Sequence, residues 1–167
     1  MGITVADLMT AEPVTLTTEM TVKEMDAVLN RYGISGAPVV ELHRLVGVAS
    51  QADIIRTLWE DQHAVAEGVA LLQDTGMLLP LTVVERIQQD SRDLAARVLE
   101  LKVRDLMTAD PKVAHPDEDI REAAERMSSG GIHRLPVTDR ASGNLVGILT
   151  SMDIVTAVQR GLLRAAA

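Results

Sequence analysis

Two short runs of the sequence pair a hydroxyl side chain with an acidic side chain three residues later. They are Ser50-Gln51-Ala52-Asp53 and Thr150-Ser151-Met152-Asp153, and each follows a β-rich run. A hydroxyl at this spacing caps a helix whose first turn holds the carboxylate. The same geometry can bind a ligand, because a helix N-terminus attracts phosphate and an Asp accepts hydrogen bonds from a sugar diol. The spacing alone leaves both interpretations open.

A third run, residues 131–136, places His133 and Arg134 side by side at the start of a predicted strand. An Arg offers a planar fork that binds phosphate through two hydrogen bonds, and a His can donate one more. The alternative interpretation is a strand that opens with a solvated Arg and an incidental His. The residues alone leave this choice open as well.

The sequence offers no constellation typical of an enzyme. It contains no Cys, and its 4 His residues do not share a metal-ligand spacing such as His-x-x-x-His. It also lacks a glycine-rich phosphate loop, a nucleophile elbow and a dinucleotide fingerprint. We therefore expect no enzymatic activity, no catalytic or metal-ligating residues and no obligatory cofactor.

Four blocks of sequence occur twice in the same order, which predicts two copies of one motif. Residues 5–13 reappear as residues 103–111 with seven of nine positions identical, at an offset of 98. Pro38 and Pro136 keep that offset. Val46-Gly47 matches Val146-Gly147, and Asp53-Ile54 matches Asp153-Ile154, at an offset of 100. The second copy has therefore gained two residues between its Pro and its Val-Gly, which we place in the turn at residues 139–144.

The sequence pattern of each copy predicts a helix, two strands and a further helix. Thr21 and Glu24 form a capping box for the first helix, and Asp117 is the predicted cap of its counterpart. The predicted strands are 37–40 and 45–48 in the first copy, and 135–138 and 145–149 in the second. Closing helices are predicted to start near Ser50 and Ser151. The expected division is 1–57 for the first motif, 58–102 for a helical insertion or linker, and 103–167 for the second motif.

Composition sets the broad class. Hydrophobic residues make up 47% of the chain, with no Phe, one Trp and one Tyr, so the core must consist of aliphatic side chains and Met. The 16 basic and 24 acidic residues give a formal charge of −8, which disfavours nucleic-acid binding. The N-terminus does not resemble a signal peptide, and the apolar segments are too short to span a bilayer. We expect a soluble, cytoplasmic protein that binds neither nucleic acid nor membrane.

These blocks resemble the CBS domain, named after cystathionine β-synthase, and two copies resemble a Bateman module. The opening Asp-Leu-Met-Thr, the middle Pro-Val and the closing Val-Gly-x-x-x-x-x-Asp-Ile carry the resemblance, at about residues 4–56 and 103–160. It implies an α/β (α+β) fold of two βαββα-type motifs packed by pseudo-twofold symmetry, with the insertion between them. In the family, two clefts between the motifs commonly hold AMP, ADP, ATP or S-adenosylmethionine as regulatory ligands.

The resemblance also implies which residues bind a nucleotide. In the second copy they are Thr108, Val113, His133, Arg134, Pro136, Thr150 and Asp153. In the first copy they are Thr10, Thr15, Gly36, Pro38, Ser50 and Asp53. Family members place the ribose on the Asp, phosphates near the Ser or Thr and the His-Arg pair, and adenine near the residues before each first helix. Because Ser35-Gly36 replaces the His-Arg pair in the first copy, we expect binding to depend mainly on the second.

Two hypotheses about function follow. In the first, the chain senses an adenine nucleotide and modulates an unidentified partner protein. In the second, it is an interaction or dimerisation scaffold with empty or vestigial clefts. A homodimer is expected in either case, because the helix faces of such a pair leave a large apolar surface.

Overall fold

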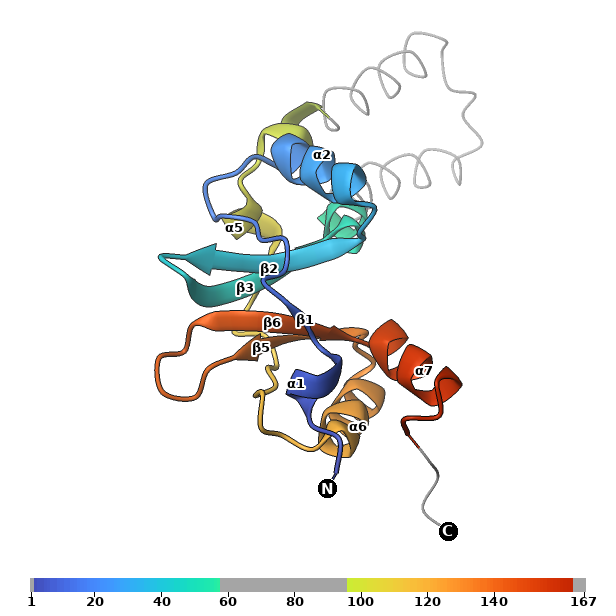
Figure 1. Cartoon of the computed structure of the whole chain (residues 1–167). Coiled ribbons are helices and arrows are strands. Elements are labelled where there is room, and N and C mark those ends of the chain that lie inside the picture. Colours follow the sequence, from blue (N-terminus) through green and yellow to red (C-terminus); the bar gives the residue numbers. More distant parts are fainter. Residues whose placement is uncertain (1, 58–95, 164–167) are drawn as a thin grey trace, which may run out of the picture. The chain divides into compact units, whose positions relative to one another are not determined.

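The computed structural model describes residues 2–57 and 96–163 (Figure 1). Most of the predicted insertion, residues 58–95, lies outside the described residues, and residues 51–57 and 96–100 are helical. The remaining helices and strands are α1 (Val5–Leu8), β1 (Thr10–Ala11), α2 (Val22–Tyr32), β2 (Gly36–Glu41), β3 (Arg44–Ser50), α5 (Val103–Leu106), β4 (Thr108–Ala109), α6 (Ile120–Gly130), β5 (Arg134–Thr138), β6 (Leu145–Thr150) and α7 (Ser151–Gln159).

The predicted α/β fold with two repeated motifs is confirmed, and both predicted hairpins and closing helices are present. The capping box of α2 is confirmed as well, because the Thr21 side chain accepts a hydrogen bond from the Glu24 N–H at 3.1 Å. The predicted cap of α6 is wrong. Asp119 caps this helix, accepting from the Arg121 N–H, whereas Asp117 forms an ion pair with Arg140 at 3.1 Å. Two acidic residues so close in sequence offer equivalent caps, and the backbone path decides between them.

The described residues divide into two compact units. The first contains residues 2–17, 37–48 and 108–163, and the second contains residues 18–36, 49–57 and 96–107. The division does not follow the sequence repeat, because each unit draws segments from both copies.

The two sheets exchange their short strands between the copies. One sheet has the order β1-β6-β5, and the other has the order β2-β3-β4. Thr10 therefore lies opposite Ile148 of the second copy, and Thr108 lies opposite Val48 of the first. Each opening strand completes a sheet whose hairpin belongs to the other copy, which the sequence pattern did not predict.

Further contacts repeat at the same offset as the sequence. Bridges join Thr4 to Asp119 and Thr21 to Lys102. The Leu16 N–H donates to the Pro38 carbonyl, and the Ala114 N–H donates to the Pro136 carbonyl, each at 2.9 Å. The structural repeat therefore extends into the loops that precede α2 and α6.

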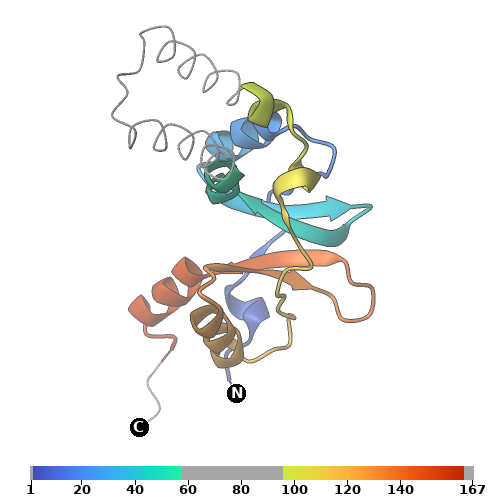
Figure 2. The ribbon, with the colours of Figure 1, turned by 180° about the vertical axis from the view of Figure 1, so that it is seen from behind.

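The first unit has an aliphatic core under the β1-β6-β5 sheet. Helices α1, α6 and α7 lie along one face of this sheet, as both ribbon views show (Figures 1 and 2). The buried residues of this core are Val5, Ala114, Ile120, Ala123, Met127, Leu135, Val137 and Leu149. The spacing of three and four residues between Ile120, Ala123 and Met127 buries one stripe of α6.

A glycine permits the close approach of β1 to β6. A Cβ at Gly147 would lie 2.5 Å from the Met9 sulfur and 3.1 Å from the Thr10 carbonyl oxygen. The sulfur could move, but the carbonyl belongs to the β1 backbone. The Gly of the repeated Val-Gly block is therefore required by strand exchange.

The second unit contains α2 and α5. Its α2 buries Val22, Met25 and Leu29. The Thr21 N–H, followed by the Thr21 hydroxyl, donates to Glu24 and holds the pKa of that carboxyl below its usual value. The Val22 N–H donates to the Leu101 carbonyl at 2.8 Å, and the Val103 N–H donates to the Met20 carbonyl at 2.8 Å. These bonds join the start of α2 to the segment that leads into α5.

The two hairpins turn differently. The β2–β3 turn consists of Leu42 and His43, both with positive φ (49° and 69°), and Leu42 is 94% exposed. The β5–β6 turn is longer and contains the two additional residues, as predicted. In this turn the Ser142 N–H, then the Ser142 hydroxyl, donate to Asp139 and lower its pKa.

Candidate functional site

Four of the predicted second-copy residues lie together where β5 begins and β6 ends. Arg134 pairs with Thr150 in the antiparallel register. The Ser151 N–H donates to the His133 carbonyl at 3.0 Å, which fixes His133 beside the start of α7. Asp153 follows in the first turn of α7. A hairpin and a helix N-terminus therefore bring together the residues that the sequence separates into two runs.

The start of α7 has the predicted capping geometry. The Thr150 N–H and hydroxyl both donate to Asp153 Oδ2, each at 2.7 Å. The Asp153 N–H donates to the Thr150 Oγ1 at 3.3 Å. For Asp153 Oδ1, the described part of the chain records no hydrogen bond. One carboxylate oxygen thus belongs to the cap, and the other is an available acceptor.

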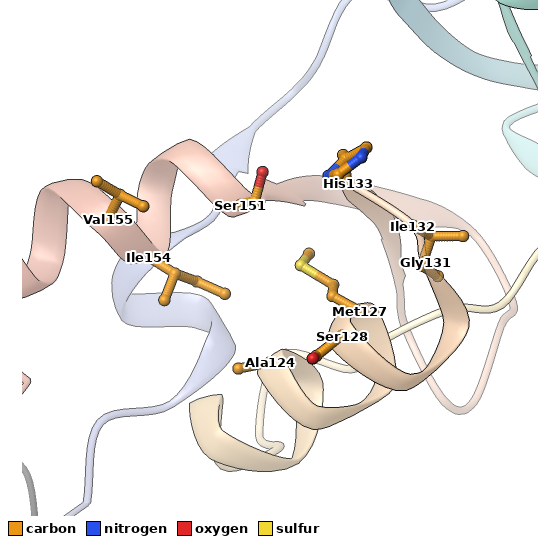
Figure 3. Close-up of a pocket in the computed structure, with 9 residues that line it drawn as sticks. All are labelled: Ala124, Met127, Ser128, Gly131, Ile132, His133, Ser151, Ile154 and Val155. Carbon is orange, nitrogen blue, oxygen red and sulfur yellow. The ribbon is translucent and has the colours of Figure 1, made fainter.

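A cavity of about 320 Å³ lies beside this cluster (Figure 3). Helix α6, the turn after it and the first residues of α7 form its walls. Met127 and Ile154 point toward one another across the cavity, and His133 lies at its edge (Figure 3). Ser128 and Ser151 supply hydroxyl groups. The cavity is largely apolar with a few polar groups, the usual composition of a small-molecule site.

A left-handed glycine shapes one wall of this cavity. Gly131 ends α6 with φ 60°, and its counterpart Gly33 ends α2 with φ 64°. The left-handed conformation favours glycine and turns the chain sharply away from the helix axis. This turn directs residues 132–134 back along the start of α7, and places His133 at the edge of the cavity.

The charge around the second-copy cluster suits an anion. His133 is exposed and Arg134 is half-buried. The Lys112 Nζ lies beside Gly130 at the C-terminal end of α6, just before the turn that leads to His133. In the described ranges, no group of three or more His, Asp or Glu side chains could hold a metal ion. The cluster can therefore offer cationic donors to an anion and one carboxylate oxygen to hydroxyl groups.

The first-copy residues form a matching but different cluster. The Ser50 N–H and hydroxyl donate to Asp53 Oδ2 at 2.8 Å and 2.7 Å, as in the second copy. The Gln51 N–H donates to the Ser35 carbonyl at 3.0 Å. Unlike Asp153, Asp53 is buried, and its Oδ1 lies 2.5 Å from Arg56 Nη2. Both oxygens of this carboxylate thus have donors.

The remaining predicted residues lie in strands and loops. Three of them are buried within strands: Gly36 and Pro38 in β2, and Pro136 in β5. Thr15 and Val113 are half-buried in the loops before α2 and α6. Strand exchange places Thr10 on the sheet of the second-copy cluster and Thr108 on the sheet of the first-copy cluster. The order along the chain therefore does not tell which cluster each Thr accompanies.

A buried ion pair fixes the Val113 segment. The Glu118 side chain is only 4% exposed, and its Oε1 lies 2.6 Å from Arg126 Nη2. The two groups are not aligned as a hydrogen bond, so the attraction is mainly between their charges. Arg126 Nη1 donates to the Val113 carbonyl at 2.8 Å.

Several residues around the clusters were missed by sequence reasoning. They are Met127, Ser128, Ser151 and Ile154 around the cavity, Lys112 beside α6, and Arg56 on Asp53. Ser151 could have been found, because it immediately follows the predicted Thr150. Arg56 could also have been found, because it lies one helical turn after Asp53, at a spacing that brings side chains into contact.

Among the described residues, each helix is too short or too polar to span a bilayer.

Known proteins resemble the chain over most of its length. It is 40% identical over 129 residues to the uncharacterized protein MJ1426 of Methanocaldococcus jannaschii, covering 75% of this chain and 73% of that protein. It is 26% identical to the inosine-5′-monophosphate dehydrogenase of Korarchaeum cryptofilum, covering 84% of this chain and 21% of that enzyme. The chain thus spans most of the first relative but about a fifth of the second.

Solved structures agree with this similarity. The CBS-pair protein CBSX2 of Arabidopsis thaliana in complex with AMP has a TM-score of 0.68 and 26% identity, covering 95% of this chain and 98% of that chain. The CBS domain pair of protein MJ0100, in complex with 5′-methylthioadenosine and S-adenosyl-L-methionine, has a TM-score of 0.68 and 22% identity, covering 96% of this chain and 98% of that chain. The CBS domain model itself matches residues 5–60 and residues 103–160. With both copies matched, this chain belongs to the CBS domain family and carries a CBS pair, or Bateman module.

Proposed function

We propose that the chain is a regulatory module that binds an adenine nucleotide, principally through its second copy, and modulates a partner protein. The observation that carries this proposal is the convergence of His133, Arg134, Thr150 and Asp153 beside the cavity. A guanidinium and an imidazole can bind phosphate, and the Asp153 Oδ1 can accept hydrogen bonds from ribose hydroxyls. The AMP complex of CBSX2 supports AMP as the first ligand to test.

The remaining members of the proposed site are Thr10, Thr15, Gly36, Pro38, Ser50, Asp53, Thr108, Val113 and Pro136. In this proposal the nucleotide is a regulatory ligand, no reaction is catalysed, and the output passes through another chain. The division into a first motif at 1–57, an insertion at 58–102 and a second motif at 103–167 belongs to the same proposal.

Calorimetry with AMP tests the assignment of the site. Losing a hydrogen bond to a charged group costs about 1.5–3 kcal/mol, or ten- to a hundredfold in affinity. Asp153→Ala and Arg134→Ala should each weaken AMP binding by about this factor, whereas Asp53→Ala should have a smaller effect. Equal losses at Asp53 and Asp153 would contradict the asymmetry between copies. Unchanged binding in Asp153→Ala would assign that carboxylate to helix capping alone.

A thermal-shift panel with AMP, ADP, ATP, NAD and S-adenosylmethionine separates this function from the scaffold alternative. A ligand at about 100 times its dissociation constant stabilises the folded state by about 2.7 kcal/mol. For a chain of this size that corresponds to roughly 5–10 °C in melting temperature. No shift with any of these compounds would favour a scaffold with empty clefts.

A homodimer is part of the proposal, and α7 is its proposed contact surface. Met152, Val155 and Val158 are 67%, 58% and 56% exposed on this helix. Ile55, at the position equivalent to Val155, is 56% exposed. Such apolar surface is unfavourable in water unless another chain covers it. Light scattering should report a dimer, and Val155→Glu combined with Val158→Glu should shift it to a monomer. Arg121→Glu, an exposed change on α6, is the control.

A further inference from the structure

The two repeated carboxylates differ in one contact. In the first copy, Arg56 Nη2 lies 2.5 Å from Asp53 Oδ1, and the Asp53 side chain is 9% exposed. The Arg56 side chain is 54% exposed, so the guanidinium reaches from solvent onto a nearly buried carboxylate. Because Ser50 already donates twice to Oδ2, Asp53 has a donor on each oxygen.

In the second copy, the position equivalent to Arg56 is Thr156. Its hydroxyl donates to the Met152 carbonyl at 2.7 Å, back along its own helix. Asp153 receives the same two hydrogen bonds from Thr150, both on Oδ2. Within residues 2–57 and 96–163, nothing donates to its Oδ1. The two Asp side chains therefore accept the same capping hydrogen bonds, and they differ in the contact with the Arg56 guanidinium, which is present in the first copy.

We propose that Arg56 is a latch that closes Asp53 to a ribose and leaves the chain with one working nucleoside site. This inference rests on the proposed function, because it concerns the carboxylate assigned there to the ribose. A sugar diol needs carboxylate oxygens as acceptors, and the cap already saturates Oδ2 in both copies. Oδ1 is then the acceptor that remains, and in the first copy a ligand must displace Arg56 to reach it.

The size of the effect follows from two contributions. Displacing a partly exposed ion pair weakens binding by up to about fivefold. If the ligand leaves the pair intact, its hydroxyl group loses a hydrogen bond to a charged oxygen, which weakens binding about ten- to a hundredfold. Because the ligand takes the less costly of these two routes, removing Arg56 should tighten binding at the first copy by up to about fivefold.

Reciprocal exchange of the two residues tests the latch. The probe is adenosine, which carries the ribose diol without the phosphate charge that an added or removed Arg would affect. Calorimetry on the full chain should find one adenosine site in the wild type. Arg56→Thr should strengthen the first-copy site until it is resolved as a second site, and Thr156→Arg should weaken the original site by up to about fivefold. Arg121→Thr removes the same charge from an exposed position on α6 and should leave the number of adenosine sites and their affinity unchanged.

The outcomes distinguish a failure of the latch from a failure of the proposed nucleotide binding. One site in both the wild type and Arg56→Thr would refute the latch and leave nucleoside binding standing. Loss of binding in Arg56→Thr would show that Arg56 contacts the ligand, which also refutes the latch. No adenosine or AMP binding by any variant would refute the proposed function, and the latch with it. Melting temperatures verify folding, and Arg56→Met, which removes the charge and the donors and keeps an unbranched apolar stem, replaces Arg56→Thr if that variant unfolds.

Discussion

Replacing Arg126 by Met should lower the free energy of unfolding by about 2–3 kcal/mol. The Glu118 carboxylate is nearly inaccessible, and Arg126 lies 2.6 Å from its Oε1. Without the guanidinium, a charged group stays buried. The backbone N–H of His115, 3.2 Å from Oε2, is then its remaining donor among the residues that the structure describes.

The magnitude combines a charge contribution and a hydrogen bond. Breaking a fully buried ion pair by removing one partner costs about 3–5 kcal/mol. The Arg126 side chain is 32% exposed, so water screens this interaction and reduces the cost to about 1–2 kcal/mol. The lost hydrogen bond to the Val113 carbonyl adds about 1 kcal/mol. Met keeps most of the apolar stem, so the packing contribution is small.

Urea denaturation followed by far-UV circular dichroism measures the effect. The double variant Glu118→Gln/Arg126→Met removes both charges and should lose less stability than Arg126→Met alone. Arg121→Met, at an exposed position of the same helix, is the control and should change stability by less than about 0.5 kcal/mol. The reasoning is wrong if Arg126→Met behaves like this control, or if the double variant loses the full sum of its single changes.

Three other predictions follow from the fold. Gly147→Ala should destabilise the chain by about 1–3 kcal/mol in urea denaturation, because the new Cβ would crowd the β1 backbone; an unchanged midpoint would contradict the close approach. His43→Gly should raise stability by about 1 kcal/mol in the same assay, since a positive φ costs glycine little, and a loss would indicate that the imidazole makes a contact of its own. The lowered pKa of Glu24 means that its cap contributes fully at neutral pH and is lost as the pH falls through the folded-state pKa. Glu24→Gln should therefore flatten the acid limb of a stability–pH curve, and an equally steep limb would refute this.

The sequence predicted the local elements well because their determinants are local. Capping residues, apolar spacing and the Pro and Gly positions lie within a few residues of what they control. The cap at Thr21 and the additional residues in the β5–β6 turn are examples. The prediction of Asp117 as the cap of α6 was wrong, because the position of the cap depends on the bridge between Asp119 and Thr4, far away in the sequence.

The candidate site could be predicted only in part. The repeat and the family resemblance singled out His133, Arg134, Thr150 and Asp153, which the β5–β6 register brings together. Which strand pairs with which hairpin could not be predicted, because a two-residue strand such as β1 carries no pattern of its own. The cavity walls were missed for a related reason. Met127 and Ile154 read as ordinary core positions, and only the turn at Gly131 leaves space between them.

The exchange of β1 and β4 bears on how such a chain could arise by gene duplication. A product carrying a single copy has a hairpin but not the short strand that this arrangement adds to it, so it could complete its sheet only by trading strands with a second molecule. Fusing two copies makes that trade intramolecular, and replaces a bimolecular association by a high effective concentration. Since strand pairing joins the two copies, the connecting segment can lengthen at an entropic cost that grows only slowly with length. Cleavage of the connecting segment should therefore yield two fragments that remain associated, because β1 of the first fragment pairs with β6 of the second and β4 of the second pairs with β3 of the first.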